Sequence, residues 1–182
     1  MPLDHSGGTP GSQPLAYALL PATGTKTGTL VFLAGGPGEA AIPLARSAGR
    51  LLSGVRGSYD LVFVDQRGIG ASGAIDCELG SQADVAACGE RFGARRAFMS
   101  TRETTLDLED LRVALGAEQL TLLGVSYGAK VAQTYARLYP QRTARMVLDS
   151  RRRWTASTRS SSCASSACPA RCARSAGPAS AR

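Results

Sequence analysis

The chain has 182 residues, of which 43% are hydrophobic and 19% are charged. A chain of this length is enough for one domain with a buried core, and its composition excludes a fully disordered or collagen-like protein. Its apolar runs are all shorter than the roughly 20 residues that a membrane-spanning helix needs, so we expect no membrane span.

The formal net charge of +7 comes from the carboxyl-terminal segment. Residues 151–182 contain seven Arg and no Asp or Glu, which leaves 14 basic and 14 acidic residues in residues 1–150. Because the body of the chain is neutral, the net charge does not indicate a domain that binds nucleic acid or a membrane surface.

Short apolar runs alternate with helical patterns throughout residues 1–150. We predict strands at Leu30–Ala34, Leu61–Val64, Leu120–Leu123 and Arg145–Leu148, and helices at Ile42–Leu52, Thr105–Leu115 and Ser126–Leu138. Continuously apolar strands that alternate with helices are typical of a parallel sheet that is covered on both faces. The sequence therefore predicts an α/β fold.

The composition changes abruptly after Ser150. Residues 151–182 contain no Leu, Ile, Val, Phe, Met or Tyr, so they lack the large side chains that usually build a core. We therefore predict a globular domain over residues 1–150 and a disordered tail over residues 151–182. We favour a frameshift in a GC-rich gene as the origin of the tail. A flexible tail without a role and a basic arm that binds nucleic acid or anionic lipid are the alternatives.

The segment Gly124–Gly128, with the sequence GVSYG, lies between a predicted strand and a predicted helix. A serine in this position occupies a tight turn that exposes its hydroxyl group at the carboxyl end of the strand. The adjoining helix amino terminus offers backbone N–H groups that can stabilise a developing anion. We interpret Ser126 as a nucleophile, and the alternative is a serine that only caps its own helix.

Two further loops follow predicted strands. The turn that contains Gly35 and Gly36 allows backbone amides to approach a substrate oxygen, although a simple turn is the alternative interpretation. In the second loop, which begins at Asp65, we expect Asp65 and Arg67 to form a structural ion pair that braces the loop. We do not expect either of these two side chains to act in catalysis.

Four segments in this order resemble the α/β-hydrolase peptidases that include proline iminopeptidase and the tripeptidyl aminopeptidases. They are GGPG (35–38), DQRGIGAS (65–72), GVSYGAKVAQTYARLYP (124–140) and RMVLDS (145–150). The resemblance covers Pro2–Ser150 and corresponds to the amino-terminal half of such a peptidase. Ala34 stands where proline iminopeptidases have His, which favours the tripeptidyl branch.

The resemblance implies an α/β-hydrolase sheet that stops before its last strands and its cap. It further implies that Ser126 attacks a peptide or ester, with the amides of Tyr127 and of the Gly35/Gly36 turn as the oxyanion hole. Members of the family release residues from peptide amino termini and need neither a metal ion nor a cofactor.

The resemblance also suggests a disulfide between Cys77 and Cys88, and two ordinary thiols are the alternative. We expect no zinc site at the cysteines of the tail. The amino terminus lacks a secretory signal, which predicts a cytoplasmic chain as written. The family instead suggests export, because PLDHS (2–6) resembles a stretch that relatives carry downstream of additional residues.

A serine nucleophile needs a histidine base and an acid, which follow the serine in this fold in the order acid, then histidine. After Ser126 the sequence contains one acidic residue, Asp149, and no histidine. The single histidine, His5, precedes the first predicted strand, and we expect it to be an exposed polar residue. We therefore predict a truncated hydrolase that is inactive alone. The alternatives are a non-catalytic binding protein with a basic tail and an esterase that takes its base from a partner chain.

Overall fold

The computed structural model describes residues 1–77 and 81–149, and the tail predicted for residues 151–182 lies outside the described residues. Five strands form one sheet in the order β1-β3-β2-β4-β5. Their bounds are Tyr17–Leu20 (β1), Gly28–Leu33 (β2), Tyr59–Val64 (β3), Leu120–Val125 (β4) and Thr143–Asp149 (β5). β1 pairs antiparallel with β3, and all other neighbours are parallel. The four predicted strands and the parallel sheet are thus confirmed.

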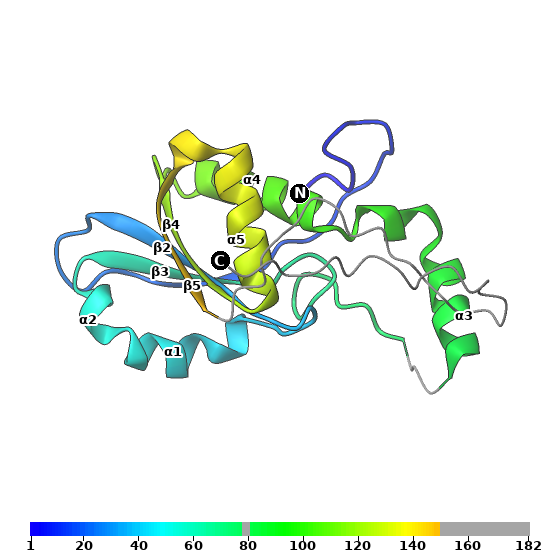
Figure 1. Ribbon diagram of the computed structural model, residues 1–182, viewed down its shortest axis with the longest axis horizontal. Helices are drawn as coiled ribbons and strands as arrows, with labels where there is room; N and C mark the ends of the chain where they lie inside the picture. The colour runs from blue at the N-terminus through cyan, green and yellow to red at the C-terminus, as the bar shows by residue number, and fades with distance from the viewer. Residues whose placement is uncertain (78–80, 150–182) are drawn as a thin grey trace, which may run out of the picture. The chain divides into compact units, whose positions relative to one another are not determined.

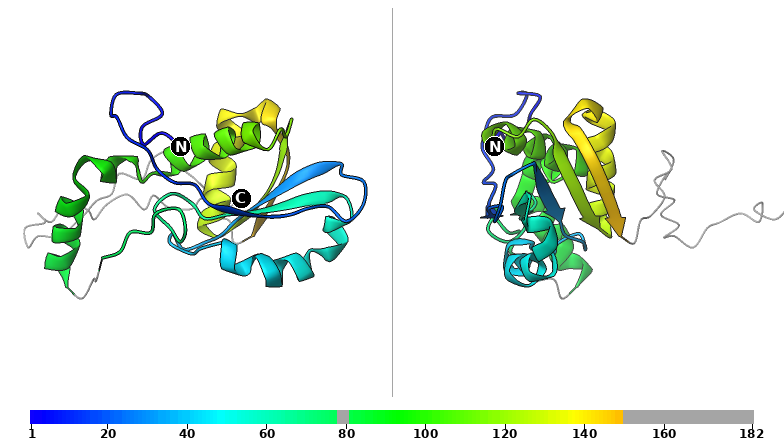
Figure 2. Two further views of the ribbon diagram at one scale, coloured as in Figure 1. Left: turned by 180° about the vertical axis from the view of Figure 1, so that it is seen from behind. Right: turned by 90° about the vertical axis from the view of Figure 1, so that its left-hand side faces the viewer.

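Helices cover both faces of this sheet (Figures 1 and 2). The helices of residues 1–77 and 81–149 are Ala45–Leu51 (α1), Ser53–Arg56 (α2), Gln82–Phe92 (α3), Thr101–Ala114 (α4) and Tyr127–Leu138 (α5), of which α3 lies away from the sheet. Short 3₁₀ segments are Ile42–Leu44 (η1), Gly93–Phe98 (η2) and Pro140–Arg142 (η3). α1 and α2 lie on one face of the sheet, and α4 and α5 lie on the other (Figure 1).

Successive residues of β2 point to opposite faces of the sheet, as strand geometry requires. Val31 belongs to the core under α4 and α5, whereas Leu30 belongs to the core under α1. The first core combines strand residues with Leu108 of α4 and Tyr135 of α5. Both faces of the central strands are therefore buried, which explains their continuous apolar sequences.

Two predicted helices have different bounds in the structure, and some elements of the structure were not predicted. The helix expected over Ile42–Leu52 is divided into η1, α1 and α2, with a proline at the start of η1. α4 begins four residues earlier than predicted, because the Ser100 side chain accepts a hydrogen bond from the Glu103 amide and caps the helix. β1, α3, η2 and η3 are not among the predicted elements.

The first residues of the chain pack back onto the domain. The Leu3 amide donates to the Gly11 carbonyl at 3.0 Å, and the Gln13 amide donates to the Met1 carbonyl at 2.8 Å. The Leu3 side chain is buried. This amino-terminal loop therefore forms part of the fold.

Candidate active site

Ser126 is the one residue that connects β4 to α5, and it lies at the carboxyl end of a central strand. Its φ and ψ angles are 51° and −113°, and it is the single non-glycine residue with a positive φ among residues 1–77 and 81–149. Its amide donates to the Asp149 carbonyl of β5 at 2.9 Å. A strained backbone at this position turns the side chain away from the strand, and Ser126 is exposed.

The glycines on either side of Ser126 allow this turn to pack. A Cβ atom on Gly124 would lie 2.6 Å from the Gly128 carbonyl oxygen. A Cβ atom on Gly128 would overlap the Leu33 carbonyl of β2. The G-x-S-x-G pattern is therefore needed for the close approach of α5 to β4 and β2.

The Ser126 hydroxyl group does not cap α5, since the helix start has no side-chain capping hydrogen bond. This geometry argues against the alternative interpretation of Ser126 as a capping residue. The amide of Tyr127 lies in the first turn of α5, where backbone N–H groups have no carbonyl partner within the helix. This amide is therefore a candidate donor beside the Ser126 hydroxyl.

The glycine turn after β2 meets the serine turn. A Cβ atom on Gly35 would lie 3.1 Å from the Ser126 Cβ atom, so a side chain at this position would crowd the serine. Gly36 has a φ of 98° and precedes a cis peptide bond to Pro37. The structure thus brings together Gly35 and Ser126, which are 91 positions apart in the sequence.

A cavity of about 490 Å³ lies beside these two turns. The glycine turn contributes Pro37 and Gly38, and α5 contributes Tyr127. Apolar side chains of Ile69, Ile75 and Met99 line other parts of its wall. The Tyr127 hydroxyl forms a 2.8 Å hydrogen bond with the Thr101 hydroxyl, which links the start of α5 to the start of α4. A largely apolar cavity of this size is typical of a small-molecule or side-chain pocket.

The predicted ion pair between Asp65 and Arg67 is wrong, although both side chains do brace the loop. The Asp65 carboxylate accepts hydrogen bonds from the backbone amides of Ala41 at 2.8 Å and Ala71 at 2.9 Å. These amides satisfy the buried carboxylate without a cationic partner. Asp65 therefore joins the segment after the glycine turn to its own loop.

Arg67 pairs instead with Asp107 of α4, and both side chains are 1% exposed. The guanidinium group donates to the two Asp107 oxygens at 2.7 and 2.6 Å, which is the bidentate geometry of strong Arg–carboxylate pairs. It also donates to the Leu3 carbonyl at 2.7 Å. Arg67 therefore holds α4 and the amino-terminal loop against the loop after β3.

His5 is not the exposed residue that we expected, because its side chain is 12% exposed. Its Nδ1 lies 2.7 Å from the Glu103 carboxylate, and its Nε2 lies 3.2 Å from that of Asp110. Burial would raise the pKa of Glu103, but hydrogen bonds from the His5 ring and backbone amide outweigh it and hold this pKa below its usual range. His5 thus fixes the amino-terminal loop on α4.

Cys77 and Cys88 form a disulfide that connects the loop after β3 to α3. The Arg91 guanidinium group lies 3.0 Å from the Cys77 sulfur. Residues 1–77 and 81–149 contain no group of three or more His, Cys, Asp or Glu side chains suited to a metal ion. None of the helices in the same residues is long and apolar enough to cross a membrane.

One polar group at the glycine turn was not predicted from the sequence. The Glu39 carboxylate accepts a hydrogen bond from the Gly35 amide at 3.2 Å. Glu39 follows the GGPG motif directly, so an acidic residue at the end of this motif was the available signal. Because Gly35 touches Ser126, this carboxylate belongs to the candidate active site.

The sheet is mostly parallel, has helices on both faces and carries a strained serine directly after a central strand. This arrangement is typical of α/β hydrolases. The family model described as "alpha/beta hydrolase fold" matches residues 28–163. The chain therefore belongs to the α/β-hydrolase fold family.

Comparison with characterised proteins gives relatives of the peptidase type. The chain is 33% identical to the serine protease Hip1 of Mycobacterium tuberculosis over 82% of this chain and 34% of that protein. It is also 33% identical to the tripeptidyl aminopeptidase of Streptomyces coelicolor, over 75% of this chain and 31% of that protein. The chain thus spans about a third of the length of the curated relatives that it matches.

Solved structures support the fold. A probable hydrolytic enzyme from Pseudomonas aeruginosa has a TM-score of 0.55 and 22% identity, over 80% of this chain and 38% of that one. A marine microorganism esterase has a TM-score of 0.52 and 20% identity, over 75% of this chain and 41% of that one. At these identities the likeness concerns the fold alone.

Proposed function

We propose that this chain carries the nucleophile half of a serine hydrolase that acts on the amino-terminal part of peptides or on esters, with Ser126 as the nucleophile. The contact between Ser126 and Gly35 is the observation that carries the proposal, because it joins a strained, exposed serine to a turn with backbone donors. The serine protease and tripeptidyl aminopeptidase relatives support the peptidase assignment. The apolar cavity lined by Tyr127 is suited to hold a side chain of the substrate.

In this mechanism the Ser126 Oγ attacks the substrate carbonyl carbon, and its proton passes to a base. The negative charge that develops on the carbonyl oxygen is stabilised by the amide of Tyr127 and by an amide of the Gly35/Gly36 turn. The bond to the leaving amine or alcohol then breaks as that group takes up the proton. Water next hydrolyses the acyl-serine ester, releases the acid product and restores the Ser126 hydroxyl group.

We also propose that the 182-residue chain does not turn over substrate by itself. Its sequence contains one histidine, and both ring nitrogens of His5 face carboxylates of α4. No other side chain of this sequence is an imidazole base. Loss of a triad histidine typically lowers turnover by several orders of magnitude, so we propose that the base comes from outside this sequence.

An activated aryl ester tests both parts of the proposal. The full chain is incubated with p-nitrophenyl butyrate, and the acylated residue is identified by mass spectrometry. We expect at most one acyl group per chain at Ser126, with little further turnover. Free imidazole should accelerate both formation and loss of this acyl group. The Ser126→Ala variant should not be acylated, whereas the exposed Ser47→Ala variant should behave as the wild type.

The two parts of the proposal fail in different ways. Equal acylation of wild type and Ser126→Ala, or none at Ser126, would show that Ser126 is not the nucleophile. Repeated turnover of a peptide or ester without added imidazole, lost in Ser126→Ala, would show instead that the chain already contains its base.

A further inference from the structure

Glu39 places a carboxylate at the point where the glycine turn meets the nucleophile. Its Oε2 accepts the 3.2 Å hydrogen bond from the Gly35 amide, which is one of the candidate oxyanion donors. A Cβ atom placed on Gly35 would lie 3.4 Å from the same Oε2 and 3.1 Å from the Ser126 Cβ atom. The carboxylate and Ser126 therefore lie on the same side of Gly35, where the reacting carbonyl of a substrate has to bind.

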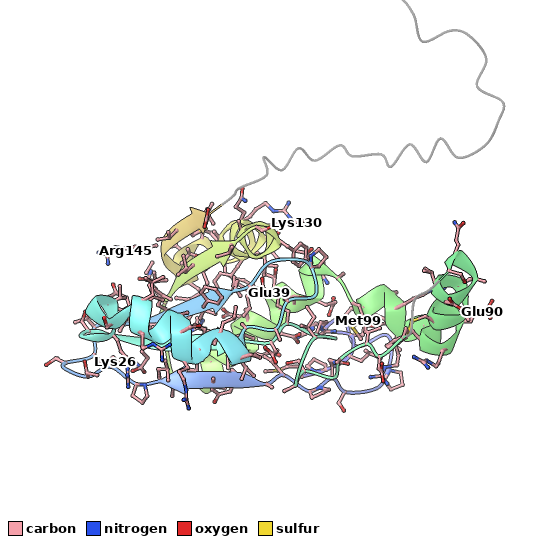
Figure 3. The ribbon with its side chains drawn as sticks, turned by 90° about the horizontal axis from the view of Figure 1, so that it is seen from below. Lys26, Glu39, Glu90, Met99, Lys130 and Arg145 are labelled. Atoms are coloured by element: carbon pink, nitrogen blue, oxygen red, sulfur yellow. A yellow bond between two sulfur atoms is a disulfide. The ribbon has the colours of Figure 1, made fainter. Side chains whose placement is uncertain are left out.

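The Glu39 carboxylate is not neutralised by a neighbouring side chain. Within residues 1–77 and 81–149, none of the ion pairs, which join oppositely charged groups within 4.0 Å, involves Glu39. Glu39 is exposed, and Figure 3 shows it on the loop that follows β2. A negative charge with only a backbone amide as partner attracts a cation that enters the site.

This contact also has a consequence for the reaction. A developing oxyanion and the Glu39 carboxylate would compete for the same Gly35 N–H group, and the two negative charges would repel each other. The Gly35 amide can therefore serve the oxyanion only after the carboxylate has moved away. A positive charge on the substrate, close to the scissile carbonyl, both attracts the carboxylate and cancels the repulsion.

We propose that Glu39 is a substrate-recognition residue that binds an ammonium group on the acyl part of the substrate and thereby releases the Gly35 amide. The inference rests on the proposed function of Ser126 and adds a reason for selecting substrates with a free amino group. The carboxylate acts by ion pairing and takes no part in proton transfer. A substrate whose amino group is acylated lacks this partner and leaves Glu39 on Gly35.

Binding measurements test Glu39 without requiring any chemistry at Ser126. The ¹⁵N-labelled full chain is titrated with leucinamide, which carries an ammonium group, and with N-acetyl-leucinamide, which is neutral. We expect leucinamide to bind about threefold to tenfold more tightly, as fits a partly exposed ion pair. The Gly35 amide resonance should shift with leucinamide, because its hydrogen bond to Glu39 is lost.

Two matched variants complete the experiment. Glu39→Gln keeps the size of the side chain and removes its charge, so it should bind the two probes equally. Glu90→Gln is the control, because Glu90 is exposed on α3 and Figure 3 shows it far from Glu39 along the molecule. Glu90→Gln should retain the wild-type preference for leucinamide.

Three results would overturn the inference: equal binding of the two probes by the wild type, a preference that persists in Glu39→Gln, or no binding of leucinamide. A second measurement compares acylation of Ser126 by the p-nitrophenyl esters of leucine and N-acetyl-leucine. If Ser126 is never acylated but the binding preference depends on Glu39, the proposed function fails and the recognition site stands. If Ser126 is acylated and the relative rates for the two esters are the same in wild type and Glu39→Gln, the proposed function stands and the recognition site fails.

Discussion

The guanidinium group of Arg67 and the carboxylate of Asp107 form a bidentate ion pair in the interior of the domain. The two hydrogen bonds are 2.7 and 2.6 Å long, and each side chain is 1% exposed. The same guanidinium group donates to the carbonyls of Leu3 at 2.7 Å and Phe98 at 3.2 Å. One side chain thus connects the loop after β3, α4, the amino-terminal loop and the end of η2.

Removal of Arg67 should destabilise the fold strongly. The Arg67→Met variant leaves the Asp107 carboxylate buried without its partner, which typically costs about 3–5 kcal/mol of unfolding free energy. Urea unfolding followed by circular dichroism measures this loss. The control is Lys26→Met, which breaks the more exposed pair with Asp60 and should cost less than about 1 kcal/mol. Similar losses in both variants would contradict the structural role of Arg67.

The parts of the fold that could be predicted from the sequence are those with a local signal. Buried parallel strands such as β2 and β4 give short apolar runs, and these runs were found. β1 also lies in a short apolar run, residues 15–20, so the sequence carries a signal for this strand that the predicted elements leave out, although Tyr17 and Leu19 on its outer face are each more than 40% exposed. The early start of α4 depends on the Ser100 cap, which is a single side-chain contact.

The same distinction applies to the candidate site. Ser126 and Gly35 each belong to a short motif whose glycines are needed for close packing, so sequence patterns locate them. The partners of Arg67 and His5 lie 40 and 98 positions away along the chain, and no spacing rule connects them. The local sequence therefore suggests Asp65 as the partner of Arg67, whereas the packing of α4 supplies Asp107.

Loss of the His5 side chain should affect stability and leave the chemistry at Ser126 unchanged. His5→Ala removes the hydrogen bonds to the carboxylates of Glu103 and Asp110, and bonds to charged groups contribute about 1.5–3 kcal/mol each at most. Because the Asp110 carboxylate is 45% exposed, its bond should contribute little, and we expect a total loss of about 1–2 kcal/mol in urea unfolding. A tenfold slower acylation of Ser126 without loss of stability would show that His5 acts as a base.

The ion pair between Asp60 and Lys26 should make stability depend on pH. The hydrogen bond from Lys26, at 2.7 Å, and the Ala22 amide hold the pKa of Asp60 below 3.8, and burial opposes them. A carboxyl group whose pKa is lower in the folded state stabilises the fold above the unfolded pKa, and this contribution is lost as the pH falls through the folded pKa.

Asp60→Asn should therefore lower the unfolding free energy by less than about 1 kcal/mol at pH 7. The difference from the wild type should shrink as the pH falls below 3.8, because the wild-type carboxyl group becomes protonated. Thermal unfolding between pH 2 and pH 7 measures the difference, with the exposed Asp76→Asn variant as the control. A difference that stays constant over this range would exclude the ion pair as its cause.

Backbone strain at Ser126 should be visible as a difference between two substitutions that both remove the nucleophile. Ser126→Gly allows the positive φ of 51° without a Cβ atom, whereas Ser126→Ala keeps the strain. Strain of this kind costs about 1–3 kcal/mol, and the extra backbone freedom of glycine in the unfolded state offsets part of the relief. We expect Ser126→Gly to be about 1 kcal/mol more stable than Ser126→Ala in urea unfolding.

The matched control for this strain lies in α1, where the backbone is helical. Ser47 is exposed there, and its hydroxyl bond to the Leu44 carbonyl is lost equally in the Gly and Ala variants. At Ser47 the order should be reversed, with Gly about 0.5–1 kcal/mol less stable than Ala. If glycine were also the less stable variant at residue 126, the turn would store no strain, and its geometry would not need the support of the surrounding β4–α5 packing.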